Sequence, residues 1–395
     1  MLPLSGMKVV DLSSVVFGPL AGQILADYGA DVIKVEAPEG DMTRTIGPAA
    51  EPGMSAIFLG VNRNKRSIVL DLKRPEARAA LHQLLATADV LMHNIRPQKL
   101  AALGLQPETL LAANPRLVYA ALNGFAEAGP YAGKPAYDDI IQGLAGCAAL
   151  MELQGGVPNY FPTIAADKIC AQVAVHAILA ALLGRARTGR GGAVEIPMFE
   201  TMTAFNLVEH FYGRHFDPPL APAGYARLLS PWRRPFKTQD SYVCLLPYTT
   251  KNWQDFFSEG GRPDLAGDPR FASVGGRTQH IAELYQAAAG IIATGTTEAW
   301  LAFCRKVDIP ASRVNRLDEL DADPHLVATG FFVDVEDDRS GRMRFPGSSV
   351  RFDGERAAVR MPPRLGEHTR EVLAAAGVSD GEVDALIASG AAQAV

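Results

Sequence analysis

Unbroken apolar runs alternate with longer amphipathic stretches through the first third of the chain. Such runs, bounded by turn-forming residues, predict buried strands, and apolar positions three and four residues apart predict helices. The expected strands cover residues 8–12, 31–36, 67–72, 90–93 and 117–122, and the expected helices cover 18–28, 75–87 and 107–113. Strands that alternate with helices indicate an α/β fold with a parallel sheet covered by helices on both faces.

The pattern changes after Glu200, where a proline-rich stretch, 214–240, mixes aromatic residues with arginines. This texture is typical of a crossing between domains. A smaller mixed domain follows, with an expected strand at 241–246 and helices near 251–258, 280–292 and 297–306. Two short strands, 331–335 and 343–345, then precede an expected last helix, 370–376. A chain of 395 residues accommodates two domains.

Composition narrows the class of function. With 21% charged residues and a net charge of −5, the chain has no basic stripe for nucleic acid. The four cysteines are far apart, which predicts neither a zinc site nor disulfides and favours a cytoplasmic protein. The N-terminus lacks the pattern of a signal peptide. No apolar run approaches the length of a membrane span, because Gln172 and His176 interrupt the most apolar helix.

The opening strand, helix and strand, with Glu36 at the end, imitate a dinucleotide-binding unit. The required G-x-G-x-x-G is missing, since the turn reads Ser13-Ser14-Val15-Val16-Phe17-Gly18-Pro19. A plain α/β scaffold is therefore favoured over NAD binding. The chain also lacks G-x-S-x-G and H-E-x-x-H motifs, so we expect neither a serine nucleophile of that type nor metal catalysis.

Asp167 is the most informative single residue. It stands at the start of an apolar helix that ends in the basic, glycine-rich stretch 185–192. A carboxylate in that position serves either as a helix cap or as a nucleophile, and local sequence leaves both readings open.

Three further segments carry candidate chemistry. The basic group 62–66, with Lys73 nearby, is either a phosphate clamp or a solvated edge. Asn94 follows the strand 90–93, where a side chain reaches the ligand crevice of a parallel sheet or merely begins a turn. Asp138 and Asp139 begin a helix and act either as caps or as a second active-site carboxylate.

Taken together, these segments resemble the family III CoA-transferases, the formyl-CoA transferase and carnitine CoA-transferase-like (CaiB/BaiF) family. The resemblance spans nearly the whole chain, and it lies in the order and spacing of many short motifs. These motifs are Val10-Asp11-Leu12, Gly18-Pro19, 29–36, Asn64-Lys65-Arg66-Ser67, Asn94-Ile95-Arg96-Pro97, Gly124-Phe125, Tyr137-Asp138, Asp167, Thr188-Gly189-Arg190-Gly191, 197–200 and 365–369.

The resemblance implies a Rossmann-like large domain built from both chain ends, 1–203 and 326–395, with a linker and small α+β domain at 204–325. It implies an interlocked homodimer. It also implies that Asp167 attacks an acyl-CoA donor, so that an aspartyl anhydride and then an aspartyl-CoA thioester form before CoA passes to an acceptor acid. Coenzyme A would be a substrate, and no tightly bound cofactor is expected. We further expect the helix amides near Asp167 to keep its carboxylate ionised.

Carried over by position, the resemblance assigns Asp138 to the active site beside Asp167. It assigns the expected CoA contacts to residues along the first half of the chain: Arg66, Leu70, Lys73, Asn94, Ile95 and Lys134.

Departures from the family pattern bear on the substrate. Val16 replaces a glutamine of the formyl-CoA enzymes, and the stretch 228–235 replaces their glycine-rich flap, so we expect neither formate nor oxalate. Arg227, Arg233 and Arg234 could pair with the distal carboxylate of a small dicarboxylate acceptor, or be ordinary surface residues. Racemases of the same fold use a His–Asp pair. Tyr137 stands at that histidine's position, and tyrosine is a poor base near neutral pH. Racemization of a 2-methylacyl-CoA is therefore the alternative to CoA transfer rather than the first choice. A non-catalytic acyl-CoA binder is a third hypothesis.

Overall fold

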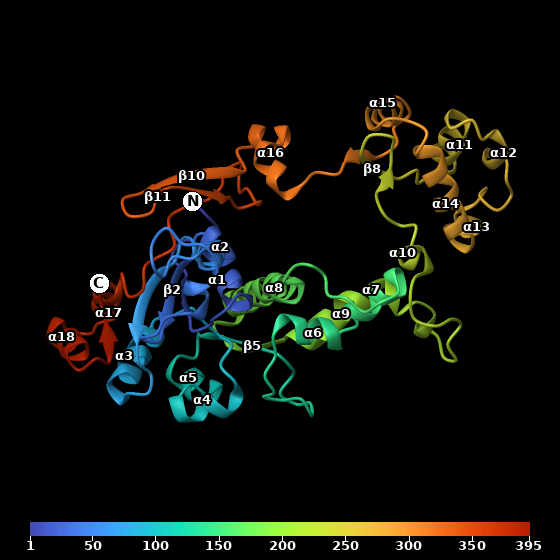
Figure 1. Ribbon diagram of the computed structural model, residues 1–395. Helices are drawn as coiled ribbons and strands as arrows, with labels where there is room; N and C mark the ends of the chain where they lie inside the picture. The colour runs from blue at the N-terminus through green and yellow to red at the C-terminus, as the bar shows by residue number, and fades with distance from the viewer. The chain divides into compact units, whose positions relative to one another are not determined.

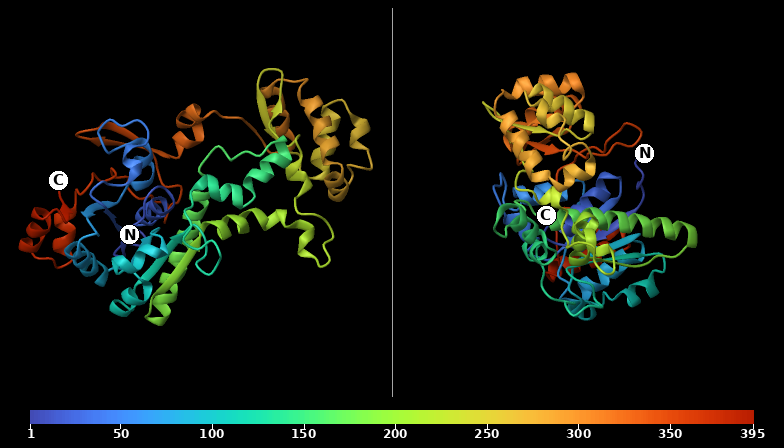
Figure 2. Two further views of the ribbon diagram at one scale, coloured as in Figure 1. Left: turned by 60° about the horizontal axis from the view of Figure 1, so that its bottom comes forward. Right: turned by 90° about the vertical axis from the view of Figure 1, so that its right-hand side faces the viewer.

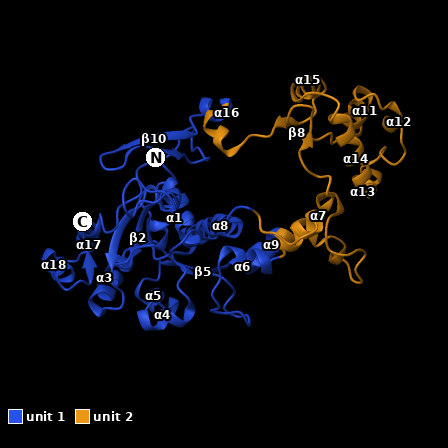
Figure 3. Ribbon diagram, viewed as in Figure 1, with its two compact units in different colours: residues 1–145, 162–205, 324–395 blue, residues 146–161, 206–323 orange.

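The computed structural model describes all residues, 1–395, and the chain forms two compact units (Figures 1 and 3). Unit 1 comprises Met1–Ala145, Pro162–Phe205 and Pro324–Val395, and unit 2 comprises Gly146–Phe161 and Asn206–Asp323. The chain passes from unit 1 to unit 2 after Phe205 and returns to unit 1 at Pro324, and the domain boundaries expected at 203 and 325 stay a prediction. The segment 146–161, which no sequence pattern marks as separate, belongs to unit 2.

A seven-stranded sheet forms the centre of unit 1, with strand order β12-β3-β2-β1-β4-β5-β6. All neighbouring pairs are parallel except β12, which pairs antiparallel with β3. The strands are β1 Lys8–Asp11, β2 Asp31–Glu36, β3 Arg66–Leu70, β4 Val90–His93, β5 Val118–Asn123, β6 Gly192–Pro197 and β12 Ala392–Gln393. Because the chain adds strands first on one side of β1 and then on the other, β1 and β4 border a topological switch point.

Helices cover the sheet of unit 1. Helices α3, α4, α5, α17 and α18 contribute to one core with the strands, and α17 and α18 (red in Figures 1 and 2) adjoin the β3 edge. Helices α1 and α8 pack against each other and against the sheet. The helices of unit 1 are α1 Phe17–Asp27, α2 Ala56–Asn62, α3 Pro75–Ala86, α4 Pro97–Leu103, α5 Pro107–Ala113, α6 Asp138–Leu144, α8 Ala165–Thr188, α16 Pro324–Ala328, α17 Thr369–Ala375 and α18 Asp380–Ala388. Helix α9, Met198–His210, begins in unit 1 and ends in unit 2.

Strands β1 to β5 of this sheet are buried on both faces, as an unbroken apolar run requires. Val10, Ile68 and Leu91 are completely shielded from solvent. The five strands expected in the first third are confirmed. The expectation that the chain ends with the helix near 370–376 is wrong, because α18 and β12 follow it.

Helix α8 corrects one expectation about membranes. By length and composition it is apolar enough to cross a bilayer, although no apolar run was expected to approach that length. It packs against α1, α6, β5 and β6, and it ends at Gly189, whose positive φ of 75° is the left-handed conformation of a helix C-cap.

Unit 2 has its own aromatic core, to which Trp253, Phe256, Phe257 and Trp300 contribute. Its three-stranded antiparallel sheet has the order β7-β8-β9. The elements are α7 Cys147–Gly155, α10 Ala226–Leu229, β7 Phe236–Lys237, β8 Tyr242–Leu245, α11 Thr250–Glu259, α12 Pro263–Ala266, α13 Val274–Gln279, α14 Ile281–Ile292, α15 Thr297–Val307 and β9 Ala311–Arg313. The antiparallel hairpin of β10 Phe332–Asp337 and β11 Gly341–Pro346 belongs to unit 1.

Candidate active site

A pocket of about 250 Å³ lies beyond the carboxyl ends of β1, β4 and β5, beside the topological switch point. This is where open α/β sheets bind ligands. Its polar lining comes from the loop after β1, the loop after β4, the segment before α6 and the start of α8. The residues that carry it are Ser14, Asn94, Arg96, Asn123, Lys134, Tyr137 and Asp167.

The loop after β5 closes on this pocket through Gly124. A Cβ atom at that position would lie 2.3 Å from the Cβ of Ala136, so only glycine allows the segment before α6 to approach the strand end. This close approach brings Lys134 and Tyr137 to the pocket wall.

Asp167 is the third residue of α8 and is 8% exposed. Its backbone N–H donates to Asp138 Oδ1 at 3.1 Å, and Asp138 Oδ2 accepts from Gln142 Nε2 at 2.6 Å. Asp138 therefore caps α8, whereas the sequence suggested a cap for the helix that Asp138 itself begins. The Asp167 carboxylate has no hydrogen-bond partner within the chain and faces the pocket.

Electrostatics at this pair overturns one expectation. Burial, followed by the neighbouring Asp138 carboxylate, raises the pKa of Asp167 to about 7. The start of α8 therefore does not keep Asp167 fully ionised, because loss of solvent outweighs the helix dipole. Asp167 is therefore partly protonated at neutral pH.

Cys170 and His93, the nearby alternatives as reactive groups, are held neutral. Burial, followed by Asp167 and Asp138, raises the pKa of the Cys170 thiol to about 12. A protonated thiol is a poor nucleophile. Burial lowers the pKa of His93 to about 4, its Nε2 lies 2.7 Å from Tyr119 Oη, and it does not line the pocket.

The loop between β1 and α1 is held in a strained conformation at the pocket wall. Val15 has φ of +74°, which a β-branched residue rarely adopts. Its N–H donates to both carboxylate oxygens of Asp41, at 3.2 and 3.3 Å. The Asn94 side chain makes two hydrogen bonds to Ser14, the residue before Val15. It accepts from Ser14 N at 3.1 Å and donates to Ser14 O at 2.9 Å. The wall is thus fixed from both sides.

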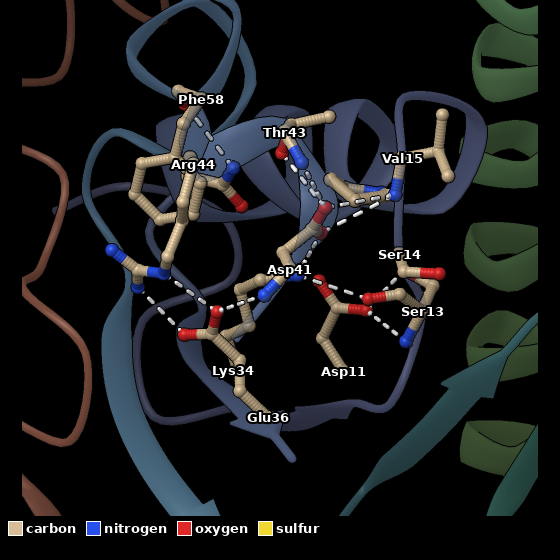
Figure 4. Close-up of polar contacts among 12 residues, drawn as sticks. Asp11, Ser13, Ser14, Val15, Lys34, Glu36, Asp41, Thr43, Arg44 and Phe58 are labelled. Carbon is tan, nitrogen blue, oxygen red and sulfur yellow. Dashed lines mark hydrogen bonds and ion pairs between the residues drawn. The ribbon is translucent and has the colours of Figure 1, made fainter. Parts of the chain in front are cut away.

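A buried network of charged side chains contacts the loop between β1 and α1 (Figure 4). Lys34 Nζ lies 2.9 Å from both Asp41 Oδ2 and the carbonyl oxygen of Ser13. Asp11 accepts from Ser13 N at 2.9 Å and from Lys65 Nζ at 3.0 Å. The ion pairs Lys34–Asp41 and Lys65–Asp11 are almost completely shielded from solvent. Each buried charge therefore has a partner, and three of them, Lys34, Asp11 and Asp41, bind the loop backbone directly.

Glu36 extends the network along β2. Arg44 pairs with it in a bidentate manner, at 2.8 and 2.7 Å, and the Arg44 guanidinium lies 3.7 Å from the centre of the Phe58 ring. Burial alone would lower the pKa of Lys34, but the surrounding carboxylates raise it above its ordinary value. This network was not predicted from the sequence. Its signal was Lys34 and Glu36 inside a buried strand, since buried charges require partners.

The structure brings together only some of the expected CoA contacts. Asn94 and Lys134 line the pocket, and the Lys134 ammonium lies 4.1 Å from the centre of the Tyr131 ring. Ile95 is partly buried against the core.

The remaining three expected contacts lie along and after β3, outside the pocket lining. Leu70 is fully buried, and Lys73 is exposed after the strand. Arg66 is paired with Asp31 at 2.5 Å and with Glu371 at 2.8 Å. A role for these residues in CoA binding stays a prediction.

The fold and this site define a doubly wound α/β protein in which a buried carboxylate, that of Asp167, faces a pocket at the topological switch point of the sheet. Residues 4–369 match the family model described as CoA-transferase family III. The chain is 35% identical over 391 residues to a succinate–glutarate CoA-transferase of Agrobacterium fabrum, covering 94% of this chain and 95% of the relative.

Solved structures agree with this assignment. The crystal structure of Rv3272 from Mycobacterium tuberculosis, orthorhombic form, matches with a TM-score of 0.81 at 30% identity, covering 94% of this chain and 99% of that one. A CAIB/BAIF family protein from Brucella suis matches with a TM-score of 0.78 at 32% identity, covering 95% and 99%. The chain belongs to CoA-transferase family III and is an enzyme of that family.

Proposed function

We propose that the enzyme moves CoA from an acyl-CoA donor to a small dicarboxylic acid, with Asp167 as the nucleophile. The observation that carries the proposal is the Asp167 carboxylate itself, which is buried, faces the pocket and has no hydrogen-bond partner within the chain. A structural carboxylate at that depth would be paired.

The reaction proceeds by exchange at carbonyl carbons. An Asp167 oxygen attacks the donor thioester carbonyl, the C–S bond breaks, and CoA leaves as a thiolate while an acyl-aspartyl anhydride forms. The thiolate attacks the aspartyl carbonyl, which releases the donor acid and leaves an aspartyl-CoA thioester. The acceptor carboxylate repeats these steps in reverse, so that CoA departs on the acceptor and Asp167 is regenerated. Each intermediate stays activated, so little free energy is lost.

The surroundings of Asp167 favour this chemistry. A desolvated carboxylate is more reactive towards a carbonyl than a hydrated one. The first-turn amides of α8 place the positive end of the helix dipole beside the oxyanion that develops during attack. Asp138 holds the Asp167 backbone in place.

The proposed acceptor, a short dicarboxylic acid, is supported by one relative of the chain. A succinate–glutarate CoA-transferase is similar over nearly the whole chain, which supports a short dicarboxylate as the acceptor. We propose that CoA contacts Asn94, Ile95 and Lys134, and that Arg66, Leu70 and Lys73 contribute beyond the pocket lining. We expect the enzyme to act in the cytoplasm as an interlocked homodimer.

The test is a transfer assay with succinyl-CoA and a panel of mono- and dicarboxylic acids. We expect CoA to pass to at least one short dicarboxylate, and the Asp167→Ala variant to lose this transfer. Asp139→Ala is the matched control, because Asp139 is exposed on α6 beside Asp138. Transfer that survives Asp167→Ala would refute the proposal. Deuterium entering the α-carbon of a 2-methylacyl-CoA without transfer would instead indicate a racemase.

A further inference from the structure

Unit 2 contains a small pocket with two arginines and no acidic residue in its lining. It has a volume of about 60 Å³, and its walls come from α10, the segment after β8, and helices α11, α13 and α14. The arginines are Arg227 and Arg277. None of its residues takes part in the Asp167 pocket.

Arg277 is the more unusual of the two, because it is a buried cation without a counter-ion. It is 5% exposed, and its Nη1 donates to Phe271 O at 2.8 Å and to Thr250 Oγ1 at 3.3 Å. Its Nη2 is buried and has no hydrogen-bond partner. Burial lowers the pKa of Arg277, and no neighbouring carboxylate opposes that effect. A buried charge left in this state is unfavourable unless an anion joins it.

Arg227 also lacks an acidic partner. Its Nε donates to Tyr285 Oη at 3.1 Å, and its guanidinium lies 5.7 Å from the centre of the Tyr248 ring. These neutral contacts orient the guanidinium and leave its charge uncompensated. Two guanidinium groups at one pocket match the planar, bidentate geometry of a carboxylate.

The rest of the lining indicates the size and kind of the anion. Leu246, Pro247, Trp253 and Ile281 contribute apolar surface, which suits an aliphatic chain better than an inorganic anion. A cavity needs roughly 10–15 Å³ of such volume to hold a single water, so this pocket of about 60 Å³ accommodates only a few heavy atoms. A CoA thioester is far too large.

We propose that this pocket of unit 2 binds the carboxylate of a short aliphatic acid, with Arg277 and Arg227 supplying the positive charge. The acid is either the acceptor of the transfer reaction or a separate short-chain acid that regulates the enzyme. The former source rests on the proposed function, and the latter does not.

The test measures binding of acetate, succinate, glutarate and inorganic phosphate to the full-length enzyme by calorimetry, in a buffer free of other small carboxylates. We expect a carboxylate to bind more tightly than phosphate. Arg277→Gln and Arg227→Gln should each weaken that binding at least tenfold, while the exposed control Arg305→Gln leaves it unchanged. If Arg277→Gln fails to fold, Arg227→Gln decides the test, because Arg227 is only partly buried.

The Asp167→Ala variant separates this site from the active site. Binding that persists in Asp167→Ala and is lost in the arginine variants supports the proposal, even if no transfer activity is found. Kinetics then assign the source: a raised KM for the acceptor alone identifies the acceptor, whereas a changed response to an added acid identifies a regulator. No carboxylate binding, tighter binding of phosphate, or equal binding in the arginine variants would overturn the proposal.

Discussion

Replacing Asp167 with asparagine should stabilise the free enzyme while it abolishes transfer. The native fold buries this carboxylate without a hydrogen-bond partner. Ionising it therefore destabilises the folded state, whereas the same carboxylate is fully hydrated in the unfolded state. Asparagine has nearly the same shape as protonated aspartic acid and carries no charge at any pH. The ionised nucleophile thus lowers the free energy of unfolding of the enzyme, as is common at catalytic sites.

The magnitude follows from the two pKa values of Asp167. The difference between about 7 in the folded chain and the ordinary 3.8 corresponds, at about 1.36 kcal/mol per pKa unit, to about 4 kcal/mol. Between these pH values the folded state retains a proton that the unfolded state has lost, so wild-type stability falls as pH rises. The advantage of Asp167→Asn should therefore be near zero below pH 3.8, about 2 kcal/mol at pH 5.5, and about 4 kcal/mol at pH 8.

The assay is urea unfolding of both proteins, followed by circular dichroism at about pH 5.5 and pH 8. The control is Asp139→Asn, which alters an exposed acid near the same site and should change stability by less than about 0.5 kcal/mol. An Asp167→Asn variant that is no more stable than wild type at pH 8, or whose advantage does not grow with pH, would refute the reasoning.

Two further predictions concern the supports of the site. Asp138→Asn keeps an oxygen that accepts from the Asp167 N–H but removes the negative charge, so the pKa of Asp167 should fall. The acidic limb of the kcat/KM profile against pH should then move to lower pH. A limb that does not move would contradict the proposed effect of the Asp138 charge on Asp167. Because Asp138 is the smaller cause, the limb should remain above the ordinary aspartate range. Lys34→Met leaves Asp41 buried without its cation, so stability in urea unfolding should fall by about 3–5 kcal/mol. The exposed control Lys99→Met should have little effect, and equal stabilities of the two variants would exclude the proposed role of the network.

The parallel sheet could be predicted because its strands β1 to β5 are buried on both faces and so read as continuous apolar runs. Strand β6 escaped prediction, since its sequence, Gly192 to Pro197, contains a glutamate and only its fifth residue is buried. Strand β12 has two residues and adds to the sheet only after the chain has returned from unit 2.

The candidate nucleophile could also be placed on its helix, but its environment could not. Asp138 and Asp167 are 29 positions apart, and only the packing of α6 against α8 brings them into contact. A sequence shows that Asp167 is near a helix start, which favours ionisation. It does not show how much solvent is excluded, and that exclusion decides the pKa.

The central claim, that Asp167 carries the acyl and CoA groups in turn, is tested most directly by trapping. The enzyme is incubated with succinyl-CoA, quenched with hydroxylamine, digested and analysed by mass spectrometry. We predict a hydroxamate on Asp167, absent from Asp167→Asn and unchanged in Asp139→Asn. A modification on Cys170 or another residue, or an unmodified Asp167 in enzyme that is actively transferring CoA, would contradict the account.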